Sequence, residues 1–70
     1  MDNQSLKAFV TVADCASFSQ AADQLHLTQS AVSKRIASLE HQTGKKLFDR
    51  IARQVTLTEA GSALLPRAQH

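Results

Sequence analysis

The sequence predicts one small, mainly α-helical domain that consists of three helices, a short β-hairpin and the beginning of a fourth helix. Three observations support this fold class: apolar residues recur at helical spacing before Gly44, the pattern changes to alternation after it, and a helical pattern returns after Thr58. A chain of 70 residues buries only one modest core, which excludes a two-domain enzyme with its own cofactor fold.

The first expected helix starts at a cap supplied by Asp2, Asn3 or Ser5. Its apolar residues fall at positions i, i+3, i+4 and i+7 and form one stripe, which comprises Leu6, Phe9, Val10 and Ala13. The helix is expected to break at residues 16–18. The lone Cys15 excludes an internal disulfide and a CxxC site, and in this apolar stretch it is expected to be a core residue.

The second expected helix is short, and Ser19 is its expected N-cap. Its inner face carries small residues that favour close contact with a neighbouring helix, namely Ala21 and Ala22, followed by Leu25. Only residues 26–28 separate it from the third helix, and His26 is a residue that tolerates the positive φ such turns need. Two helices joined by so short a turn predict a helix-turn-helix over about residues 18–37.

The third expected helix begins after Thr28, which is a good N-cap, and ends at Gly44 in a left-handed turn. Its buried stripe comprises Val32, Ile36 and Leu39. After it, two short runs at 47–50 and 54–57 are separated by residues 51–53, and Val55 alternates with Leu57 onto one face. These runs predict a small hairpin with a basic tip over about residues 47–57.

The fourth expected helix is capped by Thr58 and has Glu59 in its favoured first turn. One side of it carries Ala60, Leu64 and Ala68. Pro66 lacks the N–H that would bond to Ser62, so the helix is expected to kink or end there. Because the apolar pattern is still in progress at the last residue, we expect a chain that is cut within a longer one.

Positive charge is concentrated in one part of the chain. Residues 34–53 contain six Lys and Arg against two Asp and Glu, whereas the whole chain has a formal net charge of only +2. Such clustering is typical of a face that binds a polyanion, although most charge runs are simply solvated surface.

The third helix presents a polar face about 130° from its buried stripe. This face is expected to contact DNA bases through Gln29, Ser30, Ser33 and Lys34. Gln pairs with an adenine edge, Lys reaches guanine, and Ser bonds a base or a phosphate. A recognition helix reads bases mostly with its N-terminal residues, where these lie. The alternative is an ordinary solvated face, which would usually be richer in Glu and Lys.

A second set of residues is expected to contact the DNA backbone or the minor groove, namely Ser17, Ser19, Arg35, Arg50 and Arg53. Arg50 and Arg53 flank the hairpin tip. Arg35 lies roughly another 100° around the helix from Lys34, so a phosphate or an intramolecular pair suits it better than a base. The two serines lie near the start of the second helix, where simple capping is compatible with a phosphate contact.

The sequence offers little for catalysis, cofactor binding or membrane insertion. His26, His41 and His70 lack metal-ligand spacing, so no metal site is expected. With Gly44 and Gly61 as its only glycines, the chain has no phosphate-binding GxGxxG or P-loop. No apolar run approaches the ~18 residues of a membrane span, and no signal peptide is evident. We therefore expect no enzyme, no cofactor and no membrane partner, in a soluble chain that is not exported.

Several motifs occur in a fixed order between about residues 4 and 65, with no insertion or deletion relative to one known family pattern. They are Ser17-Phe18-Ser19, Ala21-Ala22, Thr28-Gln29-Ser30-Ala31-Val32-Ser33, Leu47-Phe48 and Leu57-Thr58-Glu59-Ala60-Gly61. In this order the chain resembles the N-terminal domain of LysR-type transcriptional regulators. The resemblance implies a winged helix-turn-helix over residues 1–58, with the hairpin as the wing, and a truncated linker helix over residues 59–70.

The resemblance also implies how the domain acts. Two subunits would pair through the linker helix, for which we expect contacts from Ala60, Ala63, Leu64 and Ala68. The full-length protein would form a tetramer in the bacterial cytoplasm, at the nucleoid when bound. A small-molecule effector is expected only in a C-terminal domain that lies outside these residues.

This chain departs from the usual family pattern at three places. Ser30 stands where Pro is common, Lys34 where Arg is common, and residues 51–52 where the wing tip is usually Thr-Gly-like. The expected function is sequence-specific binding of double-stranded DNA as a dimer on an interrupted inverted repeat. The alternative is a winged-helix module that binds another protein through the same outer face, which strong salt dependence of binding would exclude.

Overall fold

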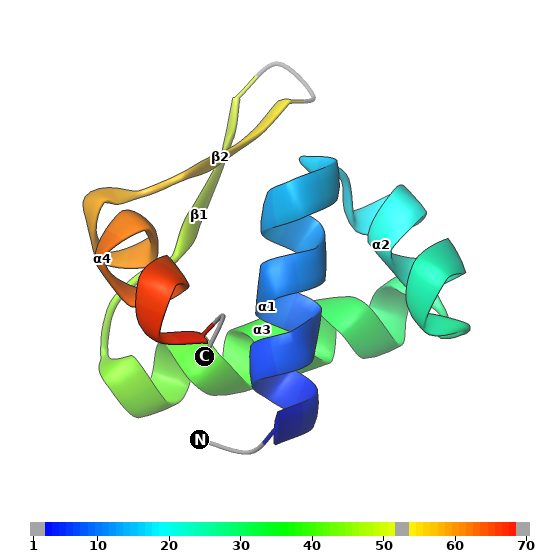
Figure 1. Ribbon diagram of the computed structural model, residues 1–70, viewed down its shortest axis with the longest axis horizontal. Helices are drawn as coiled ribbons and strands as arrows, with labels where there is room; N and C mark the ends of the chain where they lie inside the picture. Colours follow the sequence, from blue (N-terminus) through cyan, green and yellow to red (C-terminus); the bar gives the residue numbers. More distant parts are fainter. Residues whose placement is uncertain (1–2, 52–53, 69–70) are drawn as a thin grey trace.

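A computed structural model describes residues 3–51 and 54–68 of the chain. Its elements, in order, are α1 (Asn3–Cys15), α2 (Phe18–Leu25), α3 (Gln29–Thr43), β1 (Phe48–Ile51), β2 (Gln54–Leu57) and α4 (Glu59–Ala68). Helix α1 stands across α3, with α2 on one side and the hairpin and α4 on the other (Figure 1). The predicted class, mainly α with a two-stranded hairpin, is confirmed.

Helix α1 buries a face that differs from the predicted stripe. The residues it buries are Ser5, Ala8, Phe9 and Val12, whereas Leu6, Val10 and Ala13 are only partly buried at the edge of the core. The reason is that α1 is covered from several sides: α2 and α3 pack on it, and α4 packs on it as well. Cys15, expected in the core, is a half-buried free thiol at the end of α1.

The helix-turn-helix forms where the sequence predicts it, but its first cap is different. Ser17, rather than Ser19, is the N-cap of α2: its φ of −158° is extended, and its hydroxyl accepts the N–H of Gln20 at 3.2 Å. Ser19 is the second residue of the helix and is exposed. The chain reaches this cap through Ala16 at φ 51°, and it leaves α2 through His26 at φ 57°, as predicted for the turn.

Helix α3 has the caps and the buried stripe that the sequence predicts. The Thr28 hydroxyl accepts the N–H of Ala31 at 3.1 Å, and Gly44 ends the helix at φ 70°. The residues that α3 buries are Val32, Ile36 and Leu39. Because one face of α3 is fixed against α1 and α2, its opposite face is held toward solvent.

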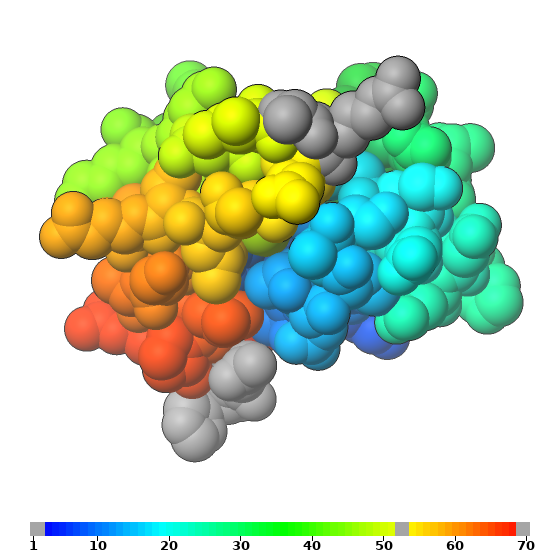
Figure 2. Space-filling model, turned by 90° about the horizontal axis from the view of Figure 1, so that it is seen from above, coloured from blue at the N-terminus to red at the C-terminus, as the bar shows by residue number. Residues whose placement is uncertain are grey.

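Strands β1 and β2, which we call the wing, pair antiparallel from Phe48↔Leu57 to Ile51↔Gln54. The sequence pattern predicts Ile51 in the connection, whereas it belongs to β1 because it is paired with Gln54. The wing rises beside α1, between α4 and the pair α1–α2 (Figure 2). Its base is anchored by Phe48, whose ring lies 5.3 Å from that of Phe9.

Helix α4 is capped, as predicted, by Thr58, whose hydroxyl accepts the N–H of Gly61 at 3.1 Å. It does not end at Pro66 but continues to Ala68. Loss of a single hydrogen bond in the last turn is tolerated because few residues follow it in the helix. The Thr58 N–H also donates to the Leu47 carbonyl at 3.0 Å, which ties the start of α4 to the base of the wing.

Candidate nucleic-acid interface

The first two turns of α3 carry the four side chains predicted to read bases. Gln29, Ser30 and Lys34 are exposed, and Ser33 is half-buried at the edge of a groove between α3 and the wing. Ser30 and Lys34 lie opposite the buried stripe, whereas Gln29 is exposed because it is the first residue of α3, and Ser33 points into the groove. The structure therefore brings the four together on one accessible surface.

The chemistry of this surface suits nucleic-acid edges. The Gln29 amide both donates and accepts, the serine hydroxyls do the same, and Lys34 adds one positive charge. An α-helix fits the major groove of B-form DNA, where each base pair shows a distinct pattern of donors and acceptors. Small side chains at Ser30 and Ser33 leave the helix backbone free to approach the bases closely.

Arg35 lies apart from this surface and has an intramolecular partner. Its Nη1 donates to Oε1 of Gln4 at 2.6 Å, so it ties α3 to the start of α1. Of the two roles expected for Arg35, the structure shows the intramolecular pair. A phosphate contact through its remaining N–H groups stays a prediction.

The two serines at the start of α2 are placed differently from each other. Ser17 is half-buried and uses its oxygen as the cap of α2, while Ser19 is exposed in the first turn. Both lie at the end of a helix where free N–H groups favour an anion. Their contact with a phosphate remains a prediction.

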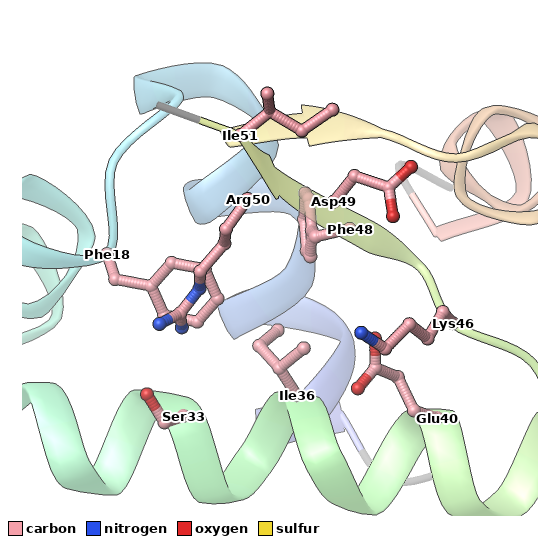
Figure 3. A pocket seen from close by; sticks show the side chains of 9 residues that line it. All are labelled: Phe18, Ser33, Ile36, Glu40, Lys46, Phe48, Asp49, Arg50 and Ile51. Atoms are coloured by element: carbon pink, nitrogen blue, oxygen red, sulfur yellow. The ribbon is translucent and has the colours of Figure 1, made fainter. Parts of the chain in front are cut away.

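Arg50 extends from β1 over the side chain of Phe18 (Figure 3). The carbon at the centre of its guanidinium lies 3.9 Å from the centre of the Phe18 ring. The pair lies in a groove of about 310 Å³ that is also lined by Ser33 and Lys46. Arg53, the other predicted wing contact, lies outside the described residues, so its role remains a prediction.

Sequence reasoning missed two contacts that hold the wing against the helix-turn-helix. One is the Arg50–Phe18 stack, and the other is a 2.9 Å hydrogen bond from the Leu47 N–H to Oε2 of Glu40. The first left only half a signal: Phe48 and Arg50 lie on the same face of β1, but nothing in the sequence indicates Phe18 as the partner. The second left no signal, because no sequence pattern pairs a carboxylate with the backbone N–H of a residue seven positions later.

The four residues predicted to pair two subunits lie on α4. Ala60, Leu64 and Ala68 are half-buried against the domain's own core, while Ala63 is exposed. Part of α4 is therefore open to solvent, but three of the four predicted residues are already partly covered by the core of their own chain. Their role in pairing stays a prediction.

Residues 3–51 and 54–68 hold neither a metal centre nor a membrane span. No group of three or more His, Cys, Asp or Glu side chains among them is placed to hold a metal ion. None of the helices in that part of the chain is both long enough and apolar enough to cross a membrane.

The fold and this surface together define a winged helix-turn-helix domain. Residues 3–62 match the family described as bacterial regulatory helix-turn-helix proteins, lysR family. Because that match spans most of the chain, the chain belongs to the lysR family, as its motifs predicted.

Curated relatives are regulators that are longer than this chain. An uncharacterized HTH-type transcriptional regulator of Azotobacter vinelandii, from the ibpB-leuC intergenic region, is 65% identical over 68 residues, which are 97% of this chain and 47% of that protein. The HTH-type transcriptional regulator CfxR of Cupriavidus necator is 52% identical over 65 residues, which are 93% of this chain and 20% of CfxR. The chain thus spans half or less of these relatives.

Solved structures with the same fold include complexes with DNA. The CbnR DNA-binding domain in complex with DNA matches at a TM-score of 0.93 and 35% identity, over 99% of this chain and 79% of that one. The BenM DNA-binding domain bound to catB site 1 DNA matches at a TM-score of 0.93 and 35% identity, over 99% of this chain and 78% of that one. Oxidized OxyR of Corynebacterium glutamicum matches at a TM-score of 0.93 and 38% identity, over 97% of this chain and 21% of that one.

Proposed function

We propose that the chain is the DNA-reading domain of a LysR-type regulator and that it binds double-stranded DNA sequence-specifically. The observation that carries the proposal is the exposed first half of α3, where Gln29, Ser30 and Lys34 are accessible to solvent. In this geometry α3 enters the major groove and the wing reaches the neighbouring backbone or minor groove. The likeness to domains solved with DNA supports the same arrangement.

The residues divide into two groups by what they touch. Gln29, Ser30, Ser33 and Lys34 contact base edges, which specify the sequence. Ser17, Ser19, Arg50 and Arg53, with Arg35 in a lesser role, contact phosphates or the minor groove, which fix the register. We assign residues 1–58 to this reading domain and residues 59–70 to the linker helix.

The domain acts as a dimer on an interrupted inverted repeat, with α4 as the pairing helix. Two copies related by a two-fold axis read two half-sites, so the operator has the same symmetry as the protein. The whole protein is a tetrameric regulator in the bacterial cytoplasm and not an enzyme. Its small-molecule effector binds outside these residues.

The test is selection of the purified 70-residue chain on a randomised duplex library at two salt concentrations. We expect enrichment of a dyad motif and a fall in log K of about 0.9 per phosphate contact for each unit of log salt. Salt-sensitive binding without a motif would support the fold and the interface but contradict specific reading by this chain. Absence of binding at low salt would overturn the proposal and favour a protein-interaction module.

A further inference from the structure

We propose that Arg50 is a positioning residue: by stacking on Phe18 it sets the wing at a fixed angle to the helix-turn-helix, so that the wing and α3 engage DNA together. This inference rests on the proposed function. It assigns to Arg50 a role in addition to the direct DNA contact proposed above.

Beyond its base, the wing is held on the β2 side by Val55, which is partly buried against the core, and the β1 side needs an anchor of its own. A two-stranded hairpin is at best marginally stable by itself. In β1 only Phe48 is buried, and the three residues that follow it are exposed. Arg50 is the next residue on the same face of the strand as Phe48. Asp49 and Ile51 alternate to the opposite face (Figure 3).

Phe18 is a rigid platform for this contact. It is the first residue of α2 and only 8% exposed, and its ring meets the Phe48 ring nearly edge-on at 6.0 Å and 74°. The Arg50 guanidinium lies over the same Phe18 ring, with its central carbon 3.9 Å from the ring centre. Phe48 and Arg50, which lie on the same face of β1, therefore both contact the ring of Phe18 in the helix-turn-helix. Any rotation of the wing would break one of these two contacts.

A stack of this kind uses the shape of arginine and not only its charge. The planar guanidinium lies flat on an aromatic face, whereas the compact and strongly hydrated ammonium of lysine does not replace it there. A phosphate, in contrast, accepts either side chain as a cation. The substitution Arg50→Lys therefore separates a positioning role from a simple phosphate contact.

The experiment measures DNA affinity and salt dependence for Arg50→Lys, Phe18→Leu and the double variant. The probe is the dyad duplex enriched from the library or, without enrichment, a mixed-sequence duplex of about 30 base pairs, three helical turns. Phe18→Tyr, which keeps the ring face, and Arg67→Lys, at an exposed position of α4, serve as controls. Thermal unfolding of each variant identifies affinity changes that come from a weakened core.

We expect Arg50→Lys and Phe18→Leu each to weaken binding by about two- to tenfold, which is the range of a cation–π contact. The double variant should bind no worse than the weaker single variant, and the salt slope of Arg50→Lys should stay unchanged. In NMR spectra of the free protein, the δ-methylene protons of Arg50 should be shifted upfield by the Phe18 ring. That shift should disappear in Phe18→Leu and persist in Phe18→Tyr.

Three results would overturn the positioning role. The first is that Arg50→Lys binds DNA as tightly as the unsubstituted protein. The second is that the double variant loses affinity by the product of the two single losses. The third is that the Arg50 protons of the unsubstituted protein show no upfield shift. If the unsubstituted chain binds neither duplex although the shift is present, the proposed function fails and this role fails with it. If it binds and the variants bind equally well, only the positioning role fails.

Discussion

The carboxylate of Glu40 accepts a hydrogen bond of 2.9 Å from the backbone N–H of Leu47. Glu40 lies in the last turns of α3, and Leu47 directly precedes the wing. On its other side, Leu47 accepts the N–H of Thr58 through its carbonyl at 3.0 Å, at the start of α4. One residue of the connecting segment thus links α3, the wing and α4. The wing is positioned by polar contacts at its base as well as by aromatic contacts along β1.

The substitution Glu40→Ala is expected to lower the free energy of unfolding by about 1–3 kcal/mol, because the partly buried Leu47 N–H loses its acceptor. The better helix propensity of alanine offsets only a few tenths of a kcal/mol. Urea unfolding monitored by circular dichroism measures the change. Glu40→Gln is the matched control, since its amide oxygen still accepts, and it should cost much less. Equal destabilisation of both variants would assign the effect to the charge instead.

Gly61 is buried where α4 packs on the base of the wing, and it leaves no room for a side chain. A Cβ there would clash with the Leu47 carbonyl oxygen and lie 2.9 Å from Cδ2 of Leu57. We expect Gly61→Ala to lower the free energy of unfolding by about 1–3 kcal/mol, although alanine is the better helix former. The adjacent exposed Ser62→Ala is the control and should be neutral or slightly stabilising. A thermal midpoint of Gly61→Ala at or above that of wild type would contradict the close packing.

Local sequence signals predicted the elements of this fold well, because each depends on nearby residues. Thr28 and Gly44 are the caps that the sequence predicts for α3, and His26 adopts the positive φ predicted for the turn. Periodicity located the buried face of α3 because only one side of that helix is covered. It failed for α1, where two overlapping apolar stripes exist and the tertiary contacts decide which is buried.

The candidate site was predictable in its outline but not in its contacts. The exposed polar face of α3 follows from helix geometry, so Ser30 and Lys34 could be found by counting residues, and Gln29 by its place at the start of the helix. The pairing of Arg35 with Gln4, and of Arg50 with Phe18, joins residues more than thirty positions apart. Such contacts depend on how helices cross, which no local pattern encodes. Both arginines were identified as functional candidates from their charge and their places on the predicted elements, and the structure shows their partners.

Arg53 is expected to contribute affinity without specificity. Because a wing arginine contacts the backbone or the minor groove, Arg53→Ala should weaken all duplexes alike and lower the salt slope by about 0.9 for each phosphate that the variant no longer neutralises. Fluorescence anisotropy with the selected duplex and a scrambled one, each at several salt concentrations, measures both quantities. Arg67→Ala, at an exposed position of α4, is the control for a general reduction of positive charge. An unchanged slope for Arg53→Ala would remove this residue from the interface.

Gln29 is expected to determine sequence preference directly. It is exposed at the first position of α3, where its amide can form two hydrogen bonds to an adenine edge. We expect Gln29→Ala to reduce affinity for the selected duplex by about 1–3 kcal/mol and to relax preference at one base pair in each half-site. The control is Gln42→Ala, which removes the same side chain from an exposed position at the far end of the same helix. Repeating the library selection with both variants measures preference position by position. If Gln29→Ala retains both affinity and preference, the surface assigned to base reading is wrong, and the wing then becomes the main contact to test.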